Sequence, residues 1–194
     1  VQPLHAEGSF KAVMKHLYDG TMRLDWPGMD FQSPEPAHSF SARGLQMGGD
    51  TVTKNNVMQS SFFWRLQQLA CCGDKSIDNM EVDLQLSGLD AQGWVDAFTK
   101  LDELKTMPME QRKDFFKTNE FHQLLVGLLR EGVRLELRQL GFAMADGRLQ
   151  ASGYVQLPKI NTFQEVVSQA ILTQMQTELR LVVPRDWAVK MLRH

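Results

Sequence analysis

The sequence predicts an α+β fold, a twisted and mainly antiparallel β-sheet with amphipathic helices packed on one face. Residues 133–157 alternate apolar and polar side chains on both sides of Asp146-Gly147, which is typical of a β-hairpin. Strand patterns separated by short turns recur between residues 20 and 90, and this order favours an antiparallel meander. The best strands each have one apolar and one charged face, so we expect the sheet to be covered on one side only.

We expect a single domain over residues 1–194, belonging to a longer protein. Its predicted parts are a strand-rich region (20–90), a helical region (93–130), the hairpin (133–157) and a helix–strand–helix unit (161–193).

The N-terminal region predicts a short helix and then a strand. Between Ser9 and Tyr18, apolar residues fall at helical spacing, and Gly20 follows the expected helix end. The apolar residues of this stripe are Phe10, Val13, Met14 and Leu17. From Met22 to Trp26 the period changes to two, which predicts a strand that Pro27-Gly28 ends.

A loop and a second strand are expected next. Residues 31–38 contain two prolines, and proline cannot donate a hydrogen bond within a sheet, so this segment is interpreted as a loop or an edge excursion. Residues 39–47 then predict a strand closed by Gly48-Gly49-Asp50. This glycine pair is interpreted as a turn and not as a phosphate loop, because the lysine and hydroxyl residue of such a loop are missing.

Residues 57–70 fit two patterns. Phe62, Trp64 and Leu66 alternate as in a strand, whereas Phe62, Leu66 and Leu69 also fall at helical spacing. Aromatic crowding and the polar residues on both sides favour the strand. Residues 76–86 clearly predict the next strand, since Val82 and Leu84 alternate with charged residues.

The region after Gly88 to Asp90 predicts helices. The first has an apolar face that includes Trp94, Phe98 and Leu104, and a second runs from Pro108 to about Arg130. Gly132 ends it.

In the hairpin, a turn at Asp146-Gly147 places Met144 opposite Leu149. A one-residue bulge near Gly141 is then needed to bring Leu137 opposite Val155.

The C-terminal region predicts a helix, a strand and a last helix. Thr162 and Glu165 form a capping-box pattern at the start of the first of these helices. Residues 177–183 predict a strand, and Pro184 begins a helix that carries Trp187 and Met191.

Composition excludes several partners. The chain has 21 basic and 23 acidic residues, a formal charge of -2, so no global field attracts nucleic acid or an anionic membrane. No run approaches the roughly 18 apolar residues that span a bilayer. Because the chain starts at Val1 and not at Met, we expect it to be a piece of a longer protein, and a leader or anchor is then expected to lie outside it.

No motif predicts catalysis, a cofactor or a metal. The histidines form no ligand pattern with each other or with the cysteines. The adjacent Cys71 and Cys72 fit either a strained vicinal disulfide or, as we favour, one thiol facing the core and one facing solvent. A hydrolase with a dispersed site needs a cleft with a histidine or paired carboxylates. We therefore expect a protein that is not an enzyme.

Eleven methionines have two interpretations. They fill gaps between a curved sheet and its helices, or they line a compliant groove for an acyl chain or a peptide. If a groove exists, its candidate residues are Met22, Trp26, Trp94, Phe98, Met144 and Met191.

In combination, several motifs resemble one family. They are LQLSGLD at residues 84–90, the hairpin with its LQASGYVQLP segment (149–158), and LRLVVPRDW at residues 179–187. Together these are similar to the YdgA-type bacterial proteins of unknown function, whose members are longer and begin with a membrane segment. The resemblance implies a protein on the periplasmic side of the inner membrane, attached only through an N-terminal anchor absent from this chain. It provides no catalytic residues.

Two functions are favoured. The first is a non-enzymatic cell-envelope scaffold or interaction domain, with a protein partner or a homodimer formed through an exposed sheet edge. The second is a carrier that holds a lipid or another apolar ligand between sheet and helices. A long apolar cavity favours the carrier, whereas a tightly filled core argues against it.

Overall fold

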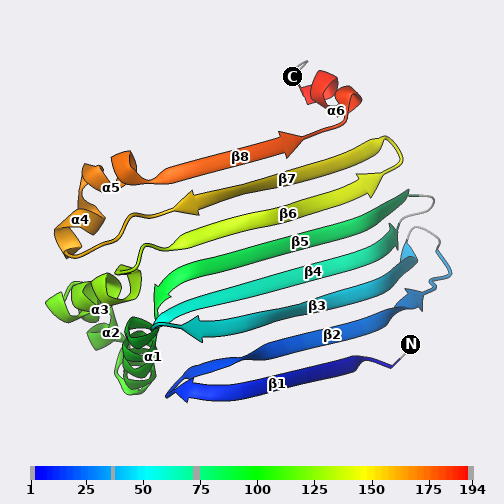
Figure 1. Cartoon of the computed structure of the whole chain (residues 1–194). Coiled ribbons are helices and arrows are strands. Elements are labelled where there is room, and N and C mark those ends of the chain that lie inside the picture. The colour runs from blue at the N-terminus through cyan, green and yellow to red at the C-terminus, as the bar shows by residue number, and fades with distance from the viewer. Residues whose placement is uncertain (1–2, 36–37, 72–74, 192–194) are drawn as a thin grey trace.

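The computed structural model describes residues 3–35, 38–71 and 75–191. Figure 1 shows one antiparallel sheet of eight strands, in which each strand pairs with its neighbours in sequence order from β1 to β8. The strands are β1 (His5–Met14), β2 (Leu17–Phe31), β3 (Phe40–Lys54), β4 (Val57–Cys71), β5 (Lys75–Asp90), β6 (Arg134–Met144), β7 (Gly147–Gln156) and β8 (Gln176–Val182). The sheet is open, with β1 and β8 as its edges, so the predicted α+β class is confirmed.

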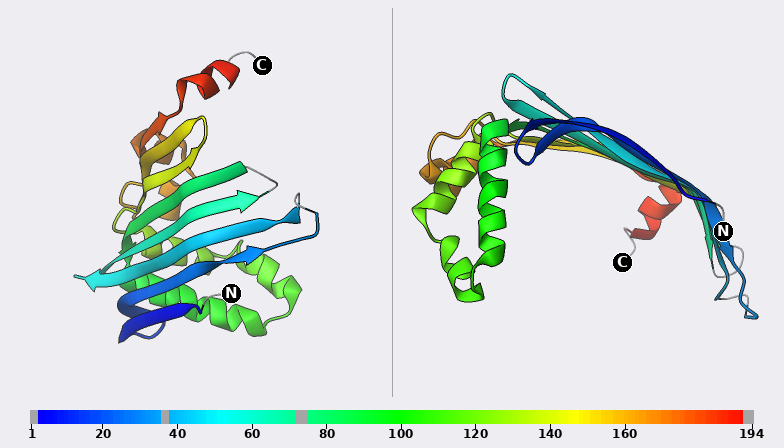
Figure 2. Two further views of the ribbon diagram at one scale, coloured as in Figure 1. Left: turned by 90° about the vertical axis from the view of Figure 1, so that its right-hand side faces the viewer. Right: turned by 90° about the horizontal axis from the view of Figure 1, so that it is seen from below.

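The helices gather at the ends of the strands. They are α1 (Ala91–Thr106), α2 (Met109–Phe115), α3 (Asn119–Leu129), α4 (Phe163–Val167), α5 (Gln169–Gln174) and α6 (Arg185–Met191). Figure 2 shows the sheet as an arch, with α1 to α3 at one end of the strands and α6 nearer the other, both on the concave side. The strands bend along their length, so the hollow of the arch runs across them.

Residues with positive φ interrupt three strands at neighbouring positions. They are Gly28 on β2, with φ 142°, Gly44 on β3, with φ 64°, and Asn79 on β5, with φ 52°. Gly28 pairs with Arg43, next to Gly44, and both Gly44 and Asn79 lie beside Gln67 of β4 in the register. Irregular residues of this kind bend a strand and increase its local twist, so their alignment accounts for part of the arch.

The small core lies where α1 and α3 meet the sheet. The buried residues of this cluster are Leu17, Met58, Leu89, Ala91 and Val133. Asp90, at the end of β5, is the N-cap of α1. Its carboxylate accepts hydrogen bonds from the backbone N–H of Gly93 at 2.7 Å and from the side chain of Asn56 at 2.9 Å. Both oxygens of this buried carboxylate are therefore paired, as burial of a charge requires.

The predicted helix over residues 9–18 is wrong. The segment is the end of β1, a turn at Lys15-His16 and the start of β2, with Met14 paired to Leu17. A hairpin places Met14 and Leu17 side by side just as one helical turn would. His16 adopts φ 61°, which lets the chain reverse there.

Two predicted strand ends are also wrong. β2 continues through Pro27-Gly28 to Phe31, because Pro27 lies beyond the part of β2 that pairs with β1. β3 continues through Gly48-Gly49, and the turn to β4 is instead at Asn55-Asn56, both with positive φ. Side chains cannot fit at the two glycines, since a Cβ on Gly49 would lie 2.3 Å from the carbonyl oxygen of Ser61.

The strands at residues 57–70, 76–86 and 177–183 are confirmed, and so is the last helix after Pro184. Residues 88–90, which precede the predicted helices, still belong to β5, since Leu89 and Asp90 pair with Met58 and Val57 of β4 on the far side of a register shift.

Two long predicted helices are each divided. Residues 108–130 form α2 and α3, because Thr118 interrupts the helix and caps α3. The helix expected after Thr162 is split at Ser168 into α4 and α5. The capping box is incomplete, since Glu165 accepts from the N–H of Asn161 while Thr162 makes no side-chain cap.

The central hairpin is confirmed, but its register is not. The turn residues are Ala145 and Asp146, with Met144 paired to Gly147 and Leu137 paired to Gly153. The irregularity lies between Leu137 and Leu140, before the predicted position. The apolar residues of β6 and β7 still lie on one face of the sheet, as predicted. The observed register differs from the predicted one by two residues at both Met144 and Leu137, and an even shift leaves each side chain on its predicted face.

Candidate functional site

Two rows of apolar residues cross the whole concave face. The first passes through all eight strands by consecutive cross-strand pairs, and its members are Gly8, Met22, Gly49, Phe62, Leu84, Leu137, Gly153 and Leu179. The second, two residues further along each strand or just past a bulge, contains Ala6, Leu24, Met47, Trp64, Val82, Leu140, Ala151 and Leu181. We call these sixteen residues the apolar gutter. None of them carries a charge or a hydroxyl group.

The gutter lies on the same side of the sheet as the helices. Trp94 of α1 lines a cavity with Leu86 of β5, which shares a face with Leu84 of the gutter. Near the other end of the strands, Trp187 of α6 lies 6.0 Å from Phe142, ring centre to ring centre, and Phe142 shares a face with Leu140. The helices therefore stand at the two ends of the arch (Figure 2). The contacts of Trp94 and Trp187 place the gutter on the face of the sheet between them.

Much of the gutter is exposed. Met22 is 51% exposed, Phe62 40% and Leu179 76%. The whole chain has an accessible surface of 13204 Å², whereas a compact monomer of 22.1 kDa is expected to have about 9,300 Å². An apolar area that crosses a whole sheet exceeds the patches normal for a monomer and marks an interaction site.

The convex face has the opposite character. Its side chains form charged and polar pairs between strands, for example Arg148 to Glu81, 2.6 Å apart. The guanidinium of Arg134 lies over the ring of Tyr154, 3.8 Å from its centre. Arg23 and Asp25 also pair there, and their hydrogen bond lowers the pKa of Asp25 and raises that of Arg23. The convex face is therefore polar and solvent-facing, whereas the concave face is apolar.

One end of the hollow contains an open apolar pocket beside α1. Its volume is about 530 Å³, and its apolar lining is made by Phe10, Leu17, Met58, Leu86 and Trp94. The indole N–H of Trp94 donates to the carbonyl oxygen of His16 at 3.3 Å, which joins α1 to the first hairpin.

Ionisable side chains lie beside this pocket, and one of them, His16, is part of its lining. Nε2 of His16 lies 3.6 Å from Asp102, beyond hydrogen-bonding distance. Lys105 donates to Asp102 and thereby lowers the pKa of that carboxyl group, while Glu120 and then Glu103 raise the pKa of Lys100. All these groups lie on α1, α3 and the first turn, outside the two rows of the gutter.

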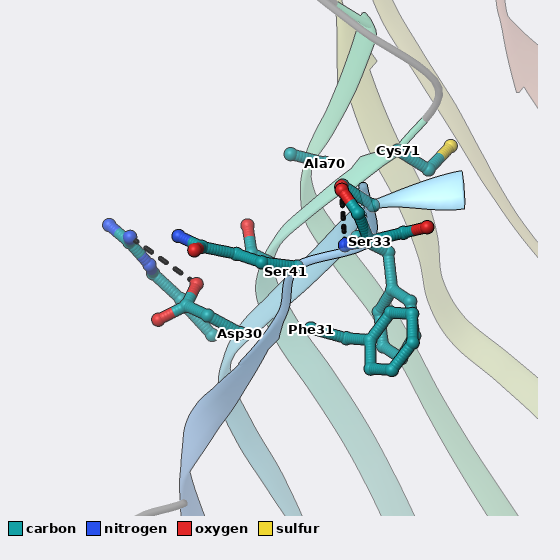
Figure 3. Close-up of a pocket in the computed structure, with 10 residues that line it drawn as sticks. Asp30, Phe31, Ser33, Ser41, Ala70 and Cys71 are labelled. Carbon is teal, nitrogen blue, oxygen red and sulfur yellow. Dashed lines mark hydrogen bonds and ion pairs between the residues drawn. The ribbon is translucent and has the colours of Figure 1, made fainter. Parts of the chain in front are cut away.

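The opposite end of β2, β3 and β4 holds an open polar pocket of about 620 Å³ (Figure 3). Asp30 and Phe31, neighbours on β2, point to opposite sides in this view. Asp30 lies 3.7 Å from Arg43, and Phe31 stacks on Phe40. Because both members of this ion pair are about 60% exposed, water screens their attraction. The pocket thus marks a polar end of these three strands.

The candidate groove residues occupy three places. Met22 belongs to the gutter, and Trp26, two residues beyond Leu24, shares its face. Trp94 and Phe98 lie together on α1, with ring centres 4.4 Å apart, at the end that contains the apolar pocket. Met144 ends β6 near α6, and Met191 belongs to α6, although its side chain is outside the described part of the chain. Cys72 is also outside it, so the Cys71-Cys72 pair is not described.

Sequence reasoning missed most of the gutter. Phe62, Trp64 and Leu84 were assigned to the apolar faces of strands, but nothing in a single strand says which residue of the next strand lies beside it. The signal that was available is the run of seven strand patterns with matched apolar faces, which predicts one continuous apolar surface if no helix covers it.

The described part of the chain has neither a metal-binding cluster nor a membrane-spanning helix. Within residues 3–35, 38–71 and 75–191, no three His, Cys, Asp or Glu residues are placed to hold a metal ion. None of the helices in this part of the chain has the length and apolar character needed to cross a membrane.

Comparison with known proteins gives one match. The family model described as "Bacterial protein of unknown function (DUF945)" matches residues 1–194. No curated protein and no solved structure matches the chain significantly.

Proposed function

The chain belongs to DUF945, a family of bacterial proteins of unknown function, and from that premise we propose that it binds the acyl chains of an amphiphile in the apolar gutter. The observation that carries this proposal is the pair of uninterrupted apolar rows across eight strands. The role is binding and not catalysis, because no gutter side chain is an acid, a base or a nucleophile.

The dimensions of the gutter suit acyl chains. Strands lie roughly 4.8 Å apart, so eight strands give a gutter about 34 Å long. One leaflet of a bilayer contributes about half of the ~30 Å hydrocarbon core, so an extended acyl chain is about half as long as the gutter. Contact with the gutter removes apolar surface from water along the whole chain, at about 0.8 kcal/mol for each buried CH₂ group.

The shape of the gutter favours a thin, flexible ligand over a folded protein. Glycines at positions 8, 49 and 153 lie between larger side chains in the first row, so the height of the row varies from strand to strand. The methionines Met22 and Met47 adapt to different ligand shapes. The helices at both ends of the strands restrict the approach of a larger partner (Figure 2).

A charge placed in the gutter tests the proposal. We expect the folded chain to bind the methyl ester of cis-parinaric acid, an uncharged fluorescent acyl probe, with energy transfer from the tryptophans of the chain. F62K should weaken this binding at least tenfold, because the bound acyl chain would desolvate an unpaired ammonium group. Phe62 is 40% exposed, so the variant is expected to fold.

Q59K is the matched control, since Gln59 is exposed on the same strand and its side chain lies on the convex face. It should bind the probe as the unmodified chain does. Equal affinity in F62K and Q59K, or no uptake by the folded unmodified chain, would refute acyl binding in the gutter.

We propose the cell envelope as the place of this activity, as the resemblance to the YdgA-type proteins implies. An acyl-binding protein there has membrane lipids within reach. Fractionation of the source bacterium should recover the full-length protein with the inner membrane, and protease should digest it once the outer membrane is opened. Recovery in the cytosolic fraction would contradict this location.

A further inference from the structure

The outer edge of β8 is an open sheet edge. All seven residues of the strand are exposed, and Leu179 and Leu181 are 76% and 57% exposed. β8 pairs with β7 without any irregularity, from Gln150–Val182 to Gln156–Gln176. Figure 1 shows β8 as the outermost strand, with α5 before it and α6 after it. Alternate backbone N–H and C=O groups therefore face away from the sheet along the strand.

β8 has few of the features that protect natural edges. Such edges are interrupted by prolines, bulges or inward-pointing charges. β1, the other edge, has an irregularity between Ala12 and Met14. β8 has neither a proline nor a bulge, and its two charged residues, Glu178 and Arg180, lie on the convex face. An edge of this kind is a template for another strand.

The sequence of β8 is complementary to itself. In an antiparallel pair of β8 strands with Leu179 opposite Leu179, Glu178 of each copy lies opposite Arg180 of the other. Both charge pairs then lie on the convex face, where opposite charges on facing residues stabilise a sheet. On the concave face, Leu179 meets Leu179 and Thr177 meets Leu181.

The same register also aligns the gutters. Leu179 is the last member of the first apolar row, so its pairing with a second Leu179 continues the row of one copy into that of the other. We propose that β8 is a homodimer interface, in which two copies pair their β8 strands antiparallel about Leu179 and join their gutters into one surface. The dimer itself does not depend on acyl binding.

Charge reversal tests the interface and the register together. In a dimer of E178R, arginine faces arginine at both charge pairs, and in a dimer of R180E, glutamate faces glutamate. Sedimentation velocity should find the unmodified chain as a dimer and each single variant with dimerisation at least tenfold weaker, because like charges now face each other.

Two restored combinations serve as controls. The double variant E178R/R180E should dimerise as the unmodified chain does, since each pair is opposite in charge again. An equimolar mixture of E178R and R180E should form mixed dimers, because every arginine then faces a glutamate. All four charges lie on exposed side chains, so folding is expected to be unaffected.

The outcomes separate the alternatives. A monomeric unmodified chain at 100 micromolar, roughly the upper range of such measurements, would overturn the proposal and indicate that a different strand covers the edge. A dimer that neither single variant weakens would place the interface elsewhere, for example at β1. A mixture that does not recover dimers would rule out the register about Leu179. Dimerisation is measured without any fatty acid, so its failure is distinct from failure of acyl binding.

Discussion

Gly93→Ala is expected to destabilise the chain by about 2 kcal/mol or more, because it forces α1 and α3 apart. A Cβ at position 93 would lie 2.6 Å from the backbone carbon of Gly127 and from the backbone nitrogen of Leu128. These are backbone atoms of the facing helix, which cannot move aside as a flexible side chain does. The clash lies within the only part of the described chain where two helices of more than ten residues cross, beside the buried cluster.

Gly127→Ala is the matched control at the same crossing, and its effect should have the opposite sign. A Cβ at position 127 would meet only the Cα of Gly93, at an ordinary contact distance of 3.8 Å. Replacing a helical glycine by alanine gains up to about 1 kcal/mol of helix propensity. Urea unfolding followed by circular dichroism measures both variants, and equal effects at the two positions would show that this close crossing is wrong.

Asp90→Ala should cost about 2 to 4 kcal/mol of unfolding free energy. It removes the hydrogen bond to the N–H of Gly93 that caps α1, a loss of about 1 kcal/mol. It also removes the hydrogen bond that the amide of Asn56 donates to this carboxylate, and a hydrogen bond to a charged group contributes about 1.5 to 3 kcal/mol. The variant therefore loosens α1 and the β3–β4 turn together, since Asp90 joins both.

Thr118→Ala provides the comparison, because it removes the corresponding cap of α3. There the hydroxyl accepts from the N–H of Phe121 at 3.3 Å, in an exposed position, so the expected loss is about 0.5 to 1 kcal/mol. Chemical unfolding under the same conditions measures the two losses. If Asp90→Ala costs no more than Thr118→Ala, the second hydrogen bond of Asp90 contributes nothing to stability.

Much of the sheet could be predicted because period-two patterns are strong where one face is apolar. The pattern failed at the first hairpin for a geometric reason. Met14 and Leu17 are three residues apart, and both a helical turn and the tight turn at Lys15-His16 bring them together. Their spacing alone could not distinguish a helix from a hairpin. The strand conformation is favoured because the rest of β2 pairs with β3.

The sequence predicts strand ends too early where glycine and proline lie at a bend within a strand and not at a turn between strands. Gly28 has φ 142°, and a Cβ there would lie 2.3 Å from the carbonyl oxygen of Ala42. Such a residue looks like a turn signal in the sequence. In the structure it shapes a long strand that continues to Phe31, because β3 pairs with it on both sides of the bend.

The gutter could be predicted only in part because it depends on register. Met22 was a candidate from its own strand, but its row is made by Gly49 and Phe62 on the next strands. Glycines carry no apolar signal in the sequence, although three of them belong to this row. The helix patterns also could not show that the centre of the sheet stays uncovered. The apolar face of an amphipathic helix indicates that the helix packs against another element, but it does not indicate which part of the sheet that element is.

Photo-cross-linking with a diazirine-bearing palmitic acid tests acyl binding in the gutter most directly. After irradiation, mass spectrometry of peptides should place the adducts on concave residues such as Met22, Phe62 and Leu84, with little on their convex neighbours Arg23 and Asp83. Excess unlabelled palmitic acid should remove these adducts. Adducts divided equally between the two faces of the folded chain, or no adduct that the competitor removes, would contradict the account.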